Sequence, residues 1–521
     1  MGTQPDSNMQ QPPDINSLKI AFIHPDLGIG GAERLVVDAA CGLQQQGHRV
    51  KIFTSHCDLN HCFEEVKNGT LKVQVFGDHL PTNYKNKFHI LFANLRQLYL
   101  IYQLHQTGQL NEYDIFIVDQ LSTCVPLLHV LGSGKILFYC HFPDMLLAQR
   151  NGLLKRMYRI PFDLFEQFTI SAADKVIVNS RFTQSIYKET FKFLKKEPDI
   201  IYPCVDSEFP KIERIDSELL SRLLCPQEKF FLSINRFERK KNITLALKAF
   251  AASKAAEQPG YKLFICGGYD ERVTENVEYL KELEEQAEVM NQKFVTISYR
   301  EFEKSKNLED INVDESTKVI FLTSISSSLK GLLLSKTELL LYTPSNEHFG
   351  IVPIEAMKYG KPVLAVNNGG PKETIFSYRP GENDKEATGW LRPAVPQYWG
   401  EVLNEFFIER KEPPDFSETC KSRVKKLYSR DVMTWYFEES IDKIVWQKKK
   451  VYAWEGMIVS TVRFLVHLII LWLIPGQSAL YLLLAILSAT HFKDYLGVLY
   501  WLGAFLFSNK TIWEFFSEDV E

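Results

Sequence analysis

Residues 339–366 form the segment that most constrains the fold. Leu339–Tyr342 is a short apolar run followed by Thr-Pro, and Pro362–Val366 is a second apolar run. Between them, Gly350 precedes a helical pattern that ends at Gly360. The segment therefore predicts a strand, a glycine turn, a helix and a strand, the repeating unit of a parallel sheet. Ligands bind outside the carboxyl ends of such strands, where the helices begin, so we expect a binding site at this turn.

Two glutamates in this unit, Glu347 and Glu355, are separated by eight positions. Glu347 lies in the predicted loop, and Glu355 lies in the first turns of the predicted helix. An anion at the start of this helix would meet free backbone N–H groups, and Gly350 would let it come close. The two carboxylates would then hold the hydroxyls of two sugars on either side of a diphosphate, as a nucleotide-sugar requires. The alternative is that both glutamates are solvated charges on a helix surface.

The alternation of strands and helices occurs twice along the chain, which predicts an α/β protein with two doubly wound, Rossmann-like domains. The first set has a strand at 18–24, a glycine loop at 28–31, a helix at 32–46 and strands at 49–54, 114–118, 135–139 and 175–178. The second set has strands at 229–234, 262–266, 294–297, 319–322, 338–342 and 362–366. The pattern lapses near residues 203–228, so we expect a linker between the two domains there.

The composition excludes several classes of function. A net charge of −4 gives no electrostatic footprint for nucleic acid. The nine cysteines are scattered and include no C-x-x-C pair, which predicts neither a disulfide framework nor a zinc site and fits a reducing compartment. No Asp-x-Asp pair or histidine cluster indicates a required metal.

The end of the chain differs in kind from the rest. Residues 457–474 are mostly apolar, and apolar runs continue at 478–489 and 495–507. Arg463 and His467, four positions apart, share one face of the first run. The pattern fits a hairpin of two membrane spans, a set of interfacial helices or a buried soluble subdomain. Three lysines at 448–450 favour the cytosolic side for everything upstream.

These patterns divide the chain into six parts. They are a disordered tail at 1–16, a first domain at 17–203, a linker at 204–228, a second domain at 229–424, a connecting helix at 425–450 and a membrane-associated hydrophobic segment at 451–521. Inside the first domain, residues 88–104 are apolar with one charge, Arg96. They predict a packed helix, with a membrane-surface helix as the alternative.

The motif around the two glutamates resembles the E-x7-E signature of the retaining glycosyltransferases of family 4, which have the GT-B fold. The resemblance implies that Glu355 binds the ribose of a nucleotide-sugar and that Glu347 meets the hydroxyls of the transferred sugar. The backbone N–H groups of Phe349, Gly350 and Ile351 would face the sugar and the diphosphate. Between the glutamates, His348 is either a hydrogen-bond donor near the sugar or a polar loop residue.

A basic run after the strand at 229–234 resembles a second motif of this family. Arg236 and Lys241 would grip the donor diphosphate, although Lys240 could take the place of Lys241. The family normally has glycine after the lysine, whereas this chain has Asn242, a residue that tolerates left-handed backbone. Fixed cations are needed because the charge of the leaving diphosphate grows as the glycosidic bond breaks.

The first domain has two further matches to the family. Gly30 and Gly31 would line the site and approach the diphosphate or the acceptor, and His141 resembles the histidine that contacts the transferred sugar at the reacting centre. The glycine loop could instead belong to a nicotinamide-dependent oxidoreductase, but Glu33 replaces the third glycine of that motif. The resemblance further implies that the acceptor hydroxyl attacks from the side of the leaving group, without a protein nucleophile.

Within this family, the segment Cys266–Val273, the residues His141–Asp144 and the hydrophobic C-terminal region resemble the mannosyltransferases of dolichol-linked oligosaccharide assembly. The resemblance implies GDP-mannose as the donor, no required cofactor, and a dolichol-diphosphate-linked mannosyl-chitobiose as the acceptor. It implies α-1,3 and then α-1,6 mannose addition on the cytosolic face of the endoplasmic reticulum membrane, with other mannosyltransferases of the pathway as partners. A catalytically inactive membrane scaffold with the same fold is the alternative.

Overall fold

The computed structural model describes residues 17–85, 87–147, 153–206, 208–309, 311, 313–407, 415–450 and 452, together with residues 481, 484, 485, 501–503 and 505. The chain divides into two compact units, residues 1–447 and 448–521. The predicted tail at 1–16 and most of the predicted hydrophobic segment at 451–521 lie outside the described residues. Among the residues that are described, no helix is long and apolar enough to cross a membrane.

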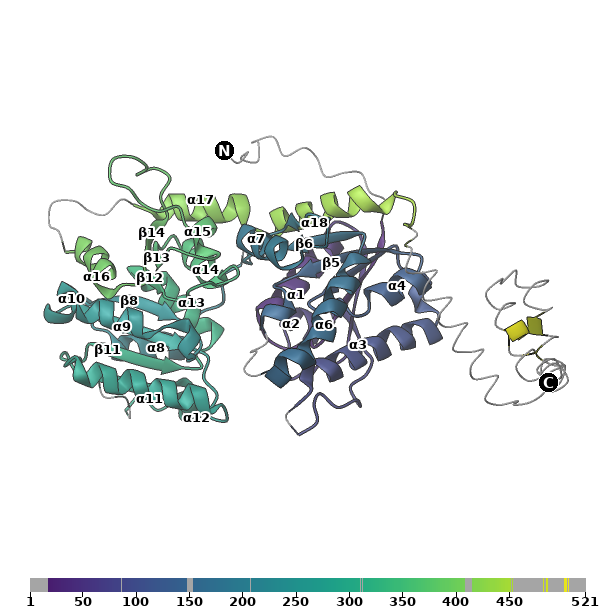
Figure 1. The fold of residues 1–521 in the computed structure, drawn as a ribbon. Helices are drawn as coiled ribbons and strands as arrows, with labels where there is room; N and C mark the ends of the chain where they lie inside the picture. The colour runs from purple at the N-terminus through teal and green to yellow at the C-terminus, as the bar shows by residue number, and fades with distance from the viewer. Residues whose placement is uncertain are drawn as a thin grey trace, which may run out of the picture. The chain divides into compact units, whose positions relative to one another are not determined.

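The first domain is a parallel sheet with helices packed around it (Figure 1). The sheet has seven strands in the order β3-β2-β1-β4-β5-β6-β7. Its strands are β1 (Lys19–His24), β2 (Arg49–Thr54), β3 (Lys72–Val75), β4 (Ile115–Asp119), β5 (Lys135–Cys140), β6 (Lys175–Val178) and β7 (Asp199–Ile200). Its helices are α1 (Gly31–Gln45), α2 (Glu64–Lys67), α3 (His89–Gln106), α4 (Val125–Leu131), α5 (Asp144–Leu147), α6 (Leu153–Ser171) and α7 (Arg181–Thr190).

The second domain repeats this design, with the strand order β10-β11-β9-β8-β12-β13-β14. Its strands are β8 (Lys229–Ile234), β9 (Tyr261–Gly267), β10 (Phe294–Ser298), β11 (Val319–Thr323), β12 (Leu339–Tyr342), β13 (Val363–Val366) and β14 (Gly389–Arg392). Its helices are α8 (Arg214–Leu223), α9 (Thr244–Ala251), α10 (Lys254–Glu257), α11 (Thr274–Val289), α12 (Tyr299–Ser305), α13 (Ser327–Lys336), α14 (Ile351–Lys358), α15 (Pro371–Thr374), α16 (Pro396–Glu405) and α17 (Ser417–Leu427).

The predicted fold class, two doubly wound α/β domains of the GT-B type, is confirmed. Every strand predicted from the sequence is present within about one residue of its expected bounds. Strands β3, β7 and β14 were not predicted, because each has at most four residues and lies near or at the edge of its sheet.

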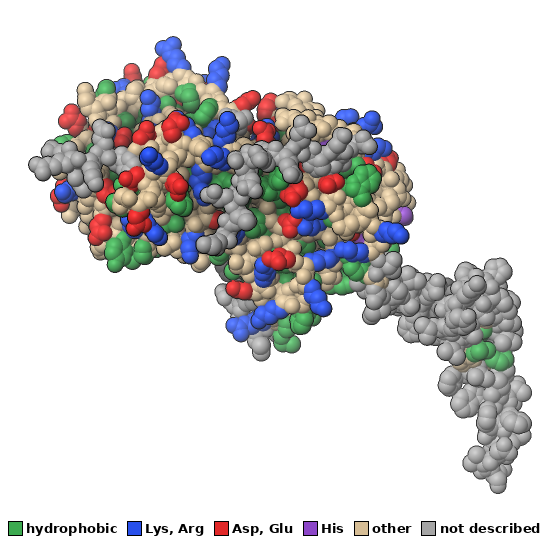
Figure 2. Space-filling model, turned by 90° about the horizontal axis from the view of Figure 1, so that it is seen from above, with side chains coloured by type: hydrophobic (Ala, Val, Ile, Leu, Met, Phe, Trp, Pro, Cys, Tyr) green, Lys and Arg blue, Asp and Glu red, His purple; other side chains and the backbone are tan. Residues whose placement is uncertain are grey.

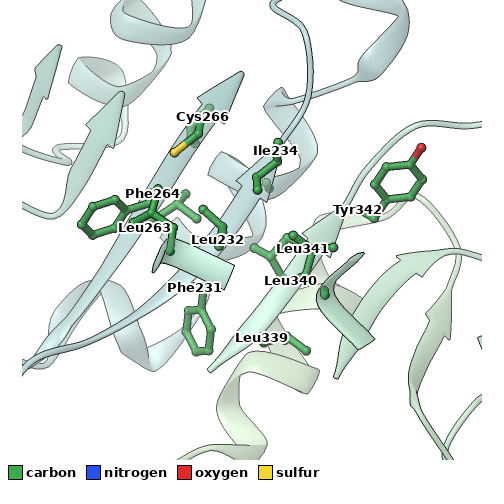
Figure 3. Close-up of a cluster of buried hydrophobic side chains, with 14 of the residues drawn as sticks. Phe231, Leu232, Ile234, Leu263, Phe264, Cys266, Leu339, Leu340, Leu341 and Tyr342 are labelled. Carbon is green, nitrogen blue, oxygen red and sulfur yellow. The ribbon is translucent and has the colours of Figure 1, made fainter. Parts of the chain in front are cut away.

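The central strands are mostly apolar because helices cover both faces of each sheet. Figure 3 shows this in the second domain, where side chains of β8, β9 and β12 pack together. Phe231, Leu232, Phe264, Leu340 and Leu341 are all fully buried in this cluster. The rigid sheet holds the loops at its carboxyl edge, where the glycine turn lies.

The predicted connecting helix at 425–450 contains α18 (Arg430–Val445), which returns to the first domain and packs against α1. Its buried side chains join the core beside the first sheet, and Phe437 stacks on Tyr139 of β5. The Arg430 guanidinium donates to the Asp38 carboxylate at 2.8 Å, and Glu438 pairs with His48 at 3.1 Å. This helix is therefore part of the first domain's core as well as a connection.

Replacing Phe437 with alanine is expected to destabilise the first domain, because the ring is fully buried between α18 and the sheet. The loss should be about 3–5 kcal/mol in the free energy of unfolding, measured by urea denaturation. Trp446, which follows α18 and is 72% exposed, provides the control. Trp446→Ala should change the same free energy by less than about 0.5 kcal/mol, and equal losses for both variants would contradict this packing.

Candidate functional site

The glycine turn before α14 brings the backbone close to the end of β12. Gly350 has a φ of +84°, and a Cβ atom there would lie 3.0 Å from the Tyr342 hydroxyl oxygen. A side chain at this position would therefore clash and would also need a strained backbone. Glycine therefore lets α14 begin at Ile351 directly after this close approach. The first N–H groups of a helix have no acceptor within it, so they can bind a ligand.

Lys241 and Glu347 form the central ion pair of the site. The Lys241 Nζ lies 2.6 Å from Glu347 Oε2, and both side chains are partly buried. Lys241 lies in the turn after β8 and Glu347 in the loop after β12, and these two strands are neighbours in the sheet. The Thr343 hydroxyl donates to the Lys241 carbonyl at 2.7 Å, which fixes the lysine backbone. The next residue, Asn242, has a left-handed φ of +49° in place of the family glycine.

Three of the four cations in the basic run, the candidates for the diphosphate, differ in their surroundings. The side chain of Lys241 is 16% exposed, whereas those of Arg236 and Lys240 are 63% and 68% exposed. Arg236 and Lys240 both pair with Glu238, at 3.1 Å and 3.0 Å. The sequence left open which of the two lysines contacts the donor. In the structure, Lys241 and not Lys240 faces the loop of residues 343–350, which carries Glu347 and which we call the glutamate loop.

Glu355 lies on α14 and pairs with Lys330 of α13, with 2.6 Å between Glu355 Oε2 and Lys330 Nζ. Its side chain is 26% exposed, and that of Glu347 is 23% exposed. Both glutamates are thus partly buried and paired with a lysine, which differs from solvated charges on a helix surface. Sequence analysis missed Lys330, because α13 carries no motif that links it to α14.

His348 contacts the first domain. Its ring stacks on the Phe142 ring with 3.7 Å between centroids and an interplanar angle of 4°, and its carbonyl accepts a hydrogen bond from the Ser180 hydroxyl at 2.6 Å. Burial lowers the pKa of His348 to about 4, although the nearby Glu347 carboxylate acts in the opposite direction. His348 is therefore a neutral ring packed on Phe142, whose role was not anticipated from the sequence.

His141 follows β5 and lies in a chain of hydrogen bonds inside the first domain. Its Nε2 is 2.8 Å from one Asp119 carboxylate oxygen, and His24 Nδ1 is 2.8 Å from the other. Sequence analysis missed Asp119 and His24. Their positions at strand ends were the available signal. His24 ends β1 and Asp119 ends β4, and β4 lies between β1 and β5 in the sheet.

The two glycines of the first-domain loop have different surroundings. A Cβ on Gly30 would collide with the Glu33 carboxylate, which folds back toward the loop, whereas Gly31 has open space around it at the start of α1. Glu33 approaches His24, with 3.8 Å between Oε1 and Nε2. Burial acts to raise the pKa of Glu33, but His24 outweighs it and holds the pKa below its usual value.

The structure thus brings the predicted second-domain residues to one edge of the second sheet and the predicted first-domain residues to the carboxyl ends of β1, β4 and β5. Phe142 and His348 join the two groups. No group of three or more His, Cys, Asp or Glu side chains in the described part of the chain is arranged to hold a metal ion. The absence of a required cofactor stays a prediction. On the face shown in Figure 2, basic and acidic side chains are interspersed.

Residues 29–209 match the model of Glycosyltransferase Family 4, and residues 221–423 match that of Glycosyl transferases group 1. The chain is 56% identical over 490 residues to the α-1,3/1,6-mannosyltransferase ALG2 of Saccharomyces cerevisiae, covering 94% of this chain and 97% of that protein. The chain belongs to the ALG2 family of glycosyltransferases.

Another relative agrees with this membership, and solved structures share the fold. The ALG2 protein of Schizosaccharomyces pombe is 48% identical over 428 residues, covering 81% of this chain and 80% of that protein. A sucrose-phosphate synthase from Thermosynechococcus elongatus superimposes with a TM-score of 0.61 at 18% identity, covering 82% of this chain and 99% of that chain. The glycosyltransferase WaaG gives a TM-score of 0.54 at 16% identity, covering 82% and 100%. For this ALG2-family chain, neither an oxidoreductase nor an inactive scaffold is favoured.

The buried ring of His348 predicts a specific pH dependence. Its pKa of about 4 lies below the usual value of 6.5, so the unfolded chain binds a proton that the folded chain excludes. The free energy of unfolding should therefore fall as the pH drops from about 6.5 toward 4. NMR of protein labelled in its histidine rings would measure the pKa directly.

Two variants identify this resonance and its cause. His348→Phe should remove the signal, and Phe142→Ala, which uncovers one ring face, should move the pKa of His348 back toward 6.5. A His348 pKa near 6.5 in the unaltered chain would contradict the packed geometry.

Proposed function

We propose that this chain transfers mannose from GDP-mannose, with retention of configuration, to a dolichol-diphosphate-linked mannosyl-chitobiose, adding an α-1,3 and then an α-1,6 mannose. The names of its ALG2 relatives support the two linkages. The structural observation that carries the proposal is the Lys241–Glu347 pair beside the glycine-opened start of α14. It offers a cation, a carboxylate and backbone N–H groups where a sugar diphosphate needs all three.

The departing GDP sets the largest electrostatic demand on this site. A helix N-terminus stabilises an anion by roughly 0.3–2 kcal/mol, whereas a preorganised donor to developing charge contributes roughly 2.7–4 kcal/mol. Lys241 is preorganised because Glu347 and Thr343 hold it in place. Arg236, which is more exposed, supplies a second cation that can turn toward the diphosphate. The cations therefore carry most of the stabilisation, and the start of α14 adds to it.

The carboxylates of the site are engaged with nitrogen groups of neighbouring side chains. Glu347 is paired with Lys241, and Asp119 is shared by two histidines. We therefore assign Glu347 to the sugar hydroxyls and Glu355, on α14, to the ribose, with no protein nucleophile. The acceptor hydroxyl then attacks from the face that the diphosphate leaves, and the departing phosphate takes its proton, which retains the configuration at the anomeric carbon.

A lipid-linked acceptor needs a route from a membrane, and one face of the first domain is suited to it. Helices α3, α4, α5 and α6 are neighbours, and they expose large apolar side chains on this domain: Phe88, Leu91, Leu95, Tyr102, Leu127, Val130, Leu131, Leu146, Leu147, Met157, Ile160, Leu164 and Phe165. Residues 79–111, which include α3, contain no Asp or Glu. An apolar face whose α3 segment carries no acidic residue is compatible with the negative surface of a cytosolic leaflet.

This face, which we call the α3–α6 face, continues into a hollow lined by Asn94, Gln120, Phe165 and Glu166 together with Asp144. Asp144 lies three residues after His141. We therefore place the lipid of the acceptor on the α3–α6 face and its sugars toward His141, with the catalytic domains on the cytosolic side of the endoplasmic reticulum membrane. Interaction with other mannosyltransferases of the pathway stays an expectation.

Charge on the α3–α6 face should weaken use of a membrane-borne acceptor. Leu91→Glu with Leu95→Glu is expected to lower transfer to a full-length dolichol acceptor in vesicles by at least about 10-fold, since burying two new carboxylates at a lipid surface is costly. Transfer to a short-chain, water-soluble acceptor should stay within about 2-fold. Val289→Glu, at an exposed position of α11 in the second domain, is the matched control. Equal loss with both acceptors would place the defect elsewhere.

The two lysines provide a matched test of the donor site. Lys241→Ala should lower the rate of mannose transfer by roughly 10²–10³-fold and weaken GDP binding, because it removes a fixed cation and leaves Glu347 unpaired. Lys240→Ala should change both by less than about 3-fold, since the Lys240 side chain is 68% exposed and pairs with Glu238 instead of Glu347. Calorimetric titration with GDP and with UDP, alongside the transfer rate, checks both variants. A stronger effect from Lys240→Ala would contradict the assignment.

A further inference from the structure

The carboxyl ends of β1, β4 and β5 hold a hydrogen-bonded chain that the donor site does not use. The three strands are parallel neighbours, with Ile23 paired to Val118 and Asp119 paired to Tyr139. Their ends therefore meet, and both oxygens of Asp119 are engaged at 2.8 Å, one by His141 Nε2 and the other by His24 Nδ1.

The side chains of the three hydrogen-bonded residues differ sharply in their exposure to solvent. The side chains of His24 and Asp119 are 0% and 1% exposed, so neither can contact a substrate. The side chain of His141 is 21% exposed, and it lies beside Phe142, which contacts the glutamate loop through His348. The buried members can therefore act on a substrate only through the ring of His141.

Asp119 and His24 are both charged although both are buried. Burial acts to raise the pKa of Asp119, but the two histidines outweigh it and hold the pKa below its usual value. Burial acts to lower the pKa of His24, but Asp119 and Glu33 outweigh it and raise this pKa to about 9. Asp119 is thus an ionised acceptor and His24 a charged donor, an arrangement that a buried carboxylate needs in order to stay charged.

We propose that Asp119 and His24 are positioning residues for His141 in mannose transfer, an inference that rests on the proposed function. An ionised carboxylate only accepts hydrogen bonds, so the proton on His141 is placed on Nε2, and Nδ1 is the ring nitrogen left for a bound sugar. His24 holds the second oxygen of Asp119 and prevents the carboxylate from turning away. The ring of His141 is therefore fixed in both orientation and tautomer before the donor binds.

The test is a double-mutant cycle on the full chain, with kcat and KM measured for transfer from GDP-mannose to a lipid-linked acceptor. Asp119→Asn should lower kcat by about 10²-fold, the scale of a misplaced catalytic group, with KM for GDP-mannose changed by less than about 3-fold. In a His141→Ala background, the same substitution should cost less than about 2-fold, because the group that it positions is gone. Equal losses in both backgrounds would overturn the proposal.

A second pair of variants covers the case in which Asp119→Asn does not fold. His24→Asn keeps an N–H donor near the place of Nδ1, and His24→Ala removes it. The asparagine variant should retain kcat within about 3-fold and the alanine variant should lose about 10-fold, again only when His141 is present. Equal kcat values for the two would overturn the proposal.

The matched control is Asp174→Asn. Asp174 is also a buried carboxylate, and it accepts from the Ile136 N–H at 2.9 Å near the opposite end of β5. This control should lower the melting temperature without changing kcat by more than about 2-fold. If the unaltered chain transfers no mannose at all, the proposed function fails; transfer with additive losses overturns the positioning role alone.

Discussion

Every strand in both sheets runs parallel to its neighbours, and this constraint places all the functional loops. In a parallel sheet the loops that follow the strands open at one edge. Lys241, in the turn after β8, and Glu347, in the loop after β12, can therefore meet at 2.6 Å although they are 106 residues apart. The same constraint brings Asp119 and His141 together in the first domain. The chemistry depends on this arrangement, because no single loop contains a complete set of groups.

The glutamate loop is held by backbone contacts as well as by its ion pair. The Gly370 N–H donates to the Glu347 carbonyl at 2.7 Å, and a Cβ on Gly370 would collide with the backbone of Phe349. The neighbouring Glu373 accepts hydrogen bonds from the Arg181 N–H at the start of α7 and from the Tyr202 hydroxyl. The loop that faces the donor is thus packed against the first domain, and its shape depends on both domains.

The sequence was sufficient for those parts of the fold that local patterns encode. Apolar runs of the central strands and the Gly350 turn are local, and both were predicted closely. Helix α18 was expected only as a connection, because nothing near Arg430 indicates its contact with Asp38, 392 residues away. Short edge strands such as β14 lack the length that makes a pattern visible.

The candidate site shows the same division. Glu347 and Lys241 were found through motifs, but spacing could not show which lysine faces the glutamate, since adjacent residues in a turn point in different directions. Asp119 and His24 were missed because a single polar residue at the end of an apolar strand carries no motif. Once the strand order β1-β4-β5 is known, their meeting with His141 follows directly.

We propose that one site, built around the Lys241–Glu347 pair, transfers mannose with retention of configuration. The most direct measurement is incubation of the chain with GDP-mannose and a defined lipid-linked mannosyl-chitobiose, followed by linkage and anomeric analysis of the product. We expect two added mannoses, one α-1,3 and one α-1,6, with no covalent mannosyl-enzyme trapped during turnover. A β-linked product, a mannosyl group attached to the protein, or no transfer would contradict this proposal.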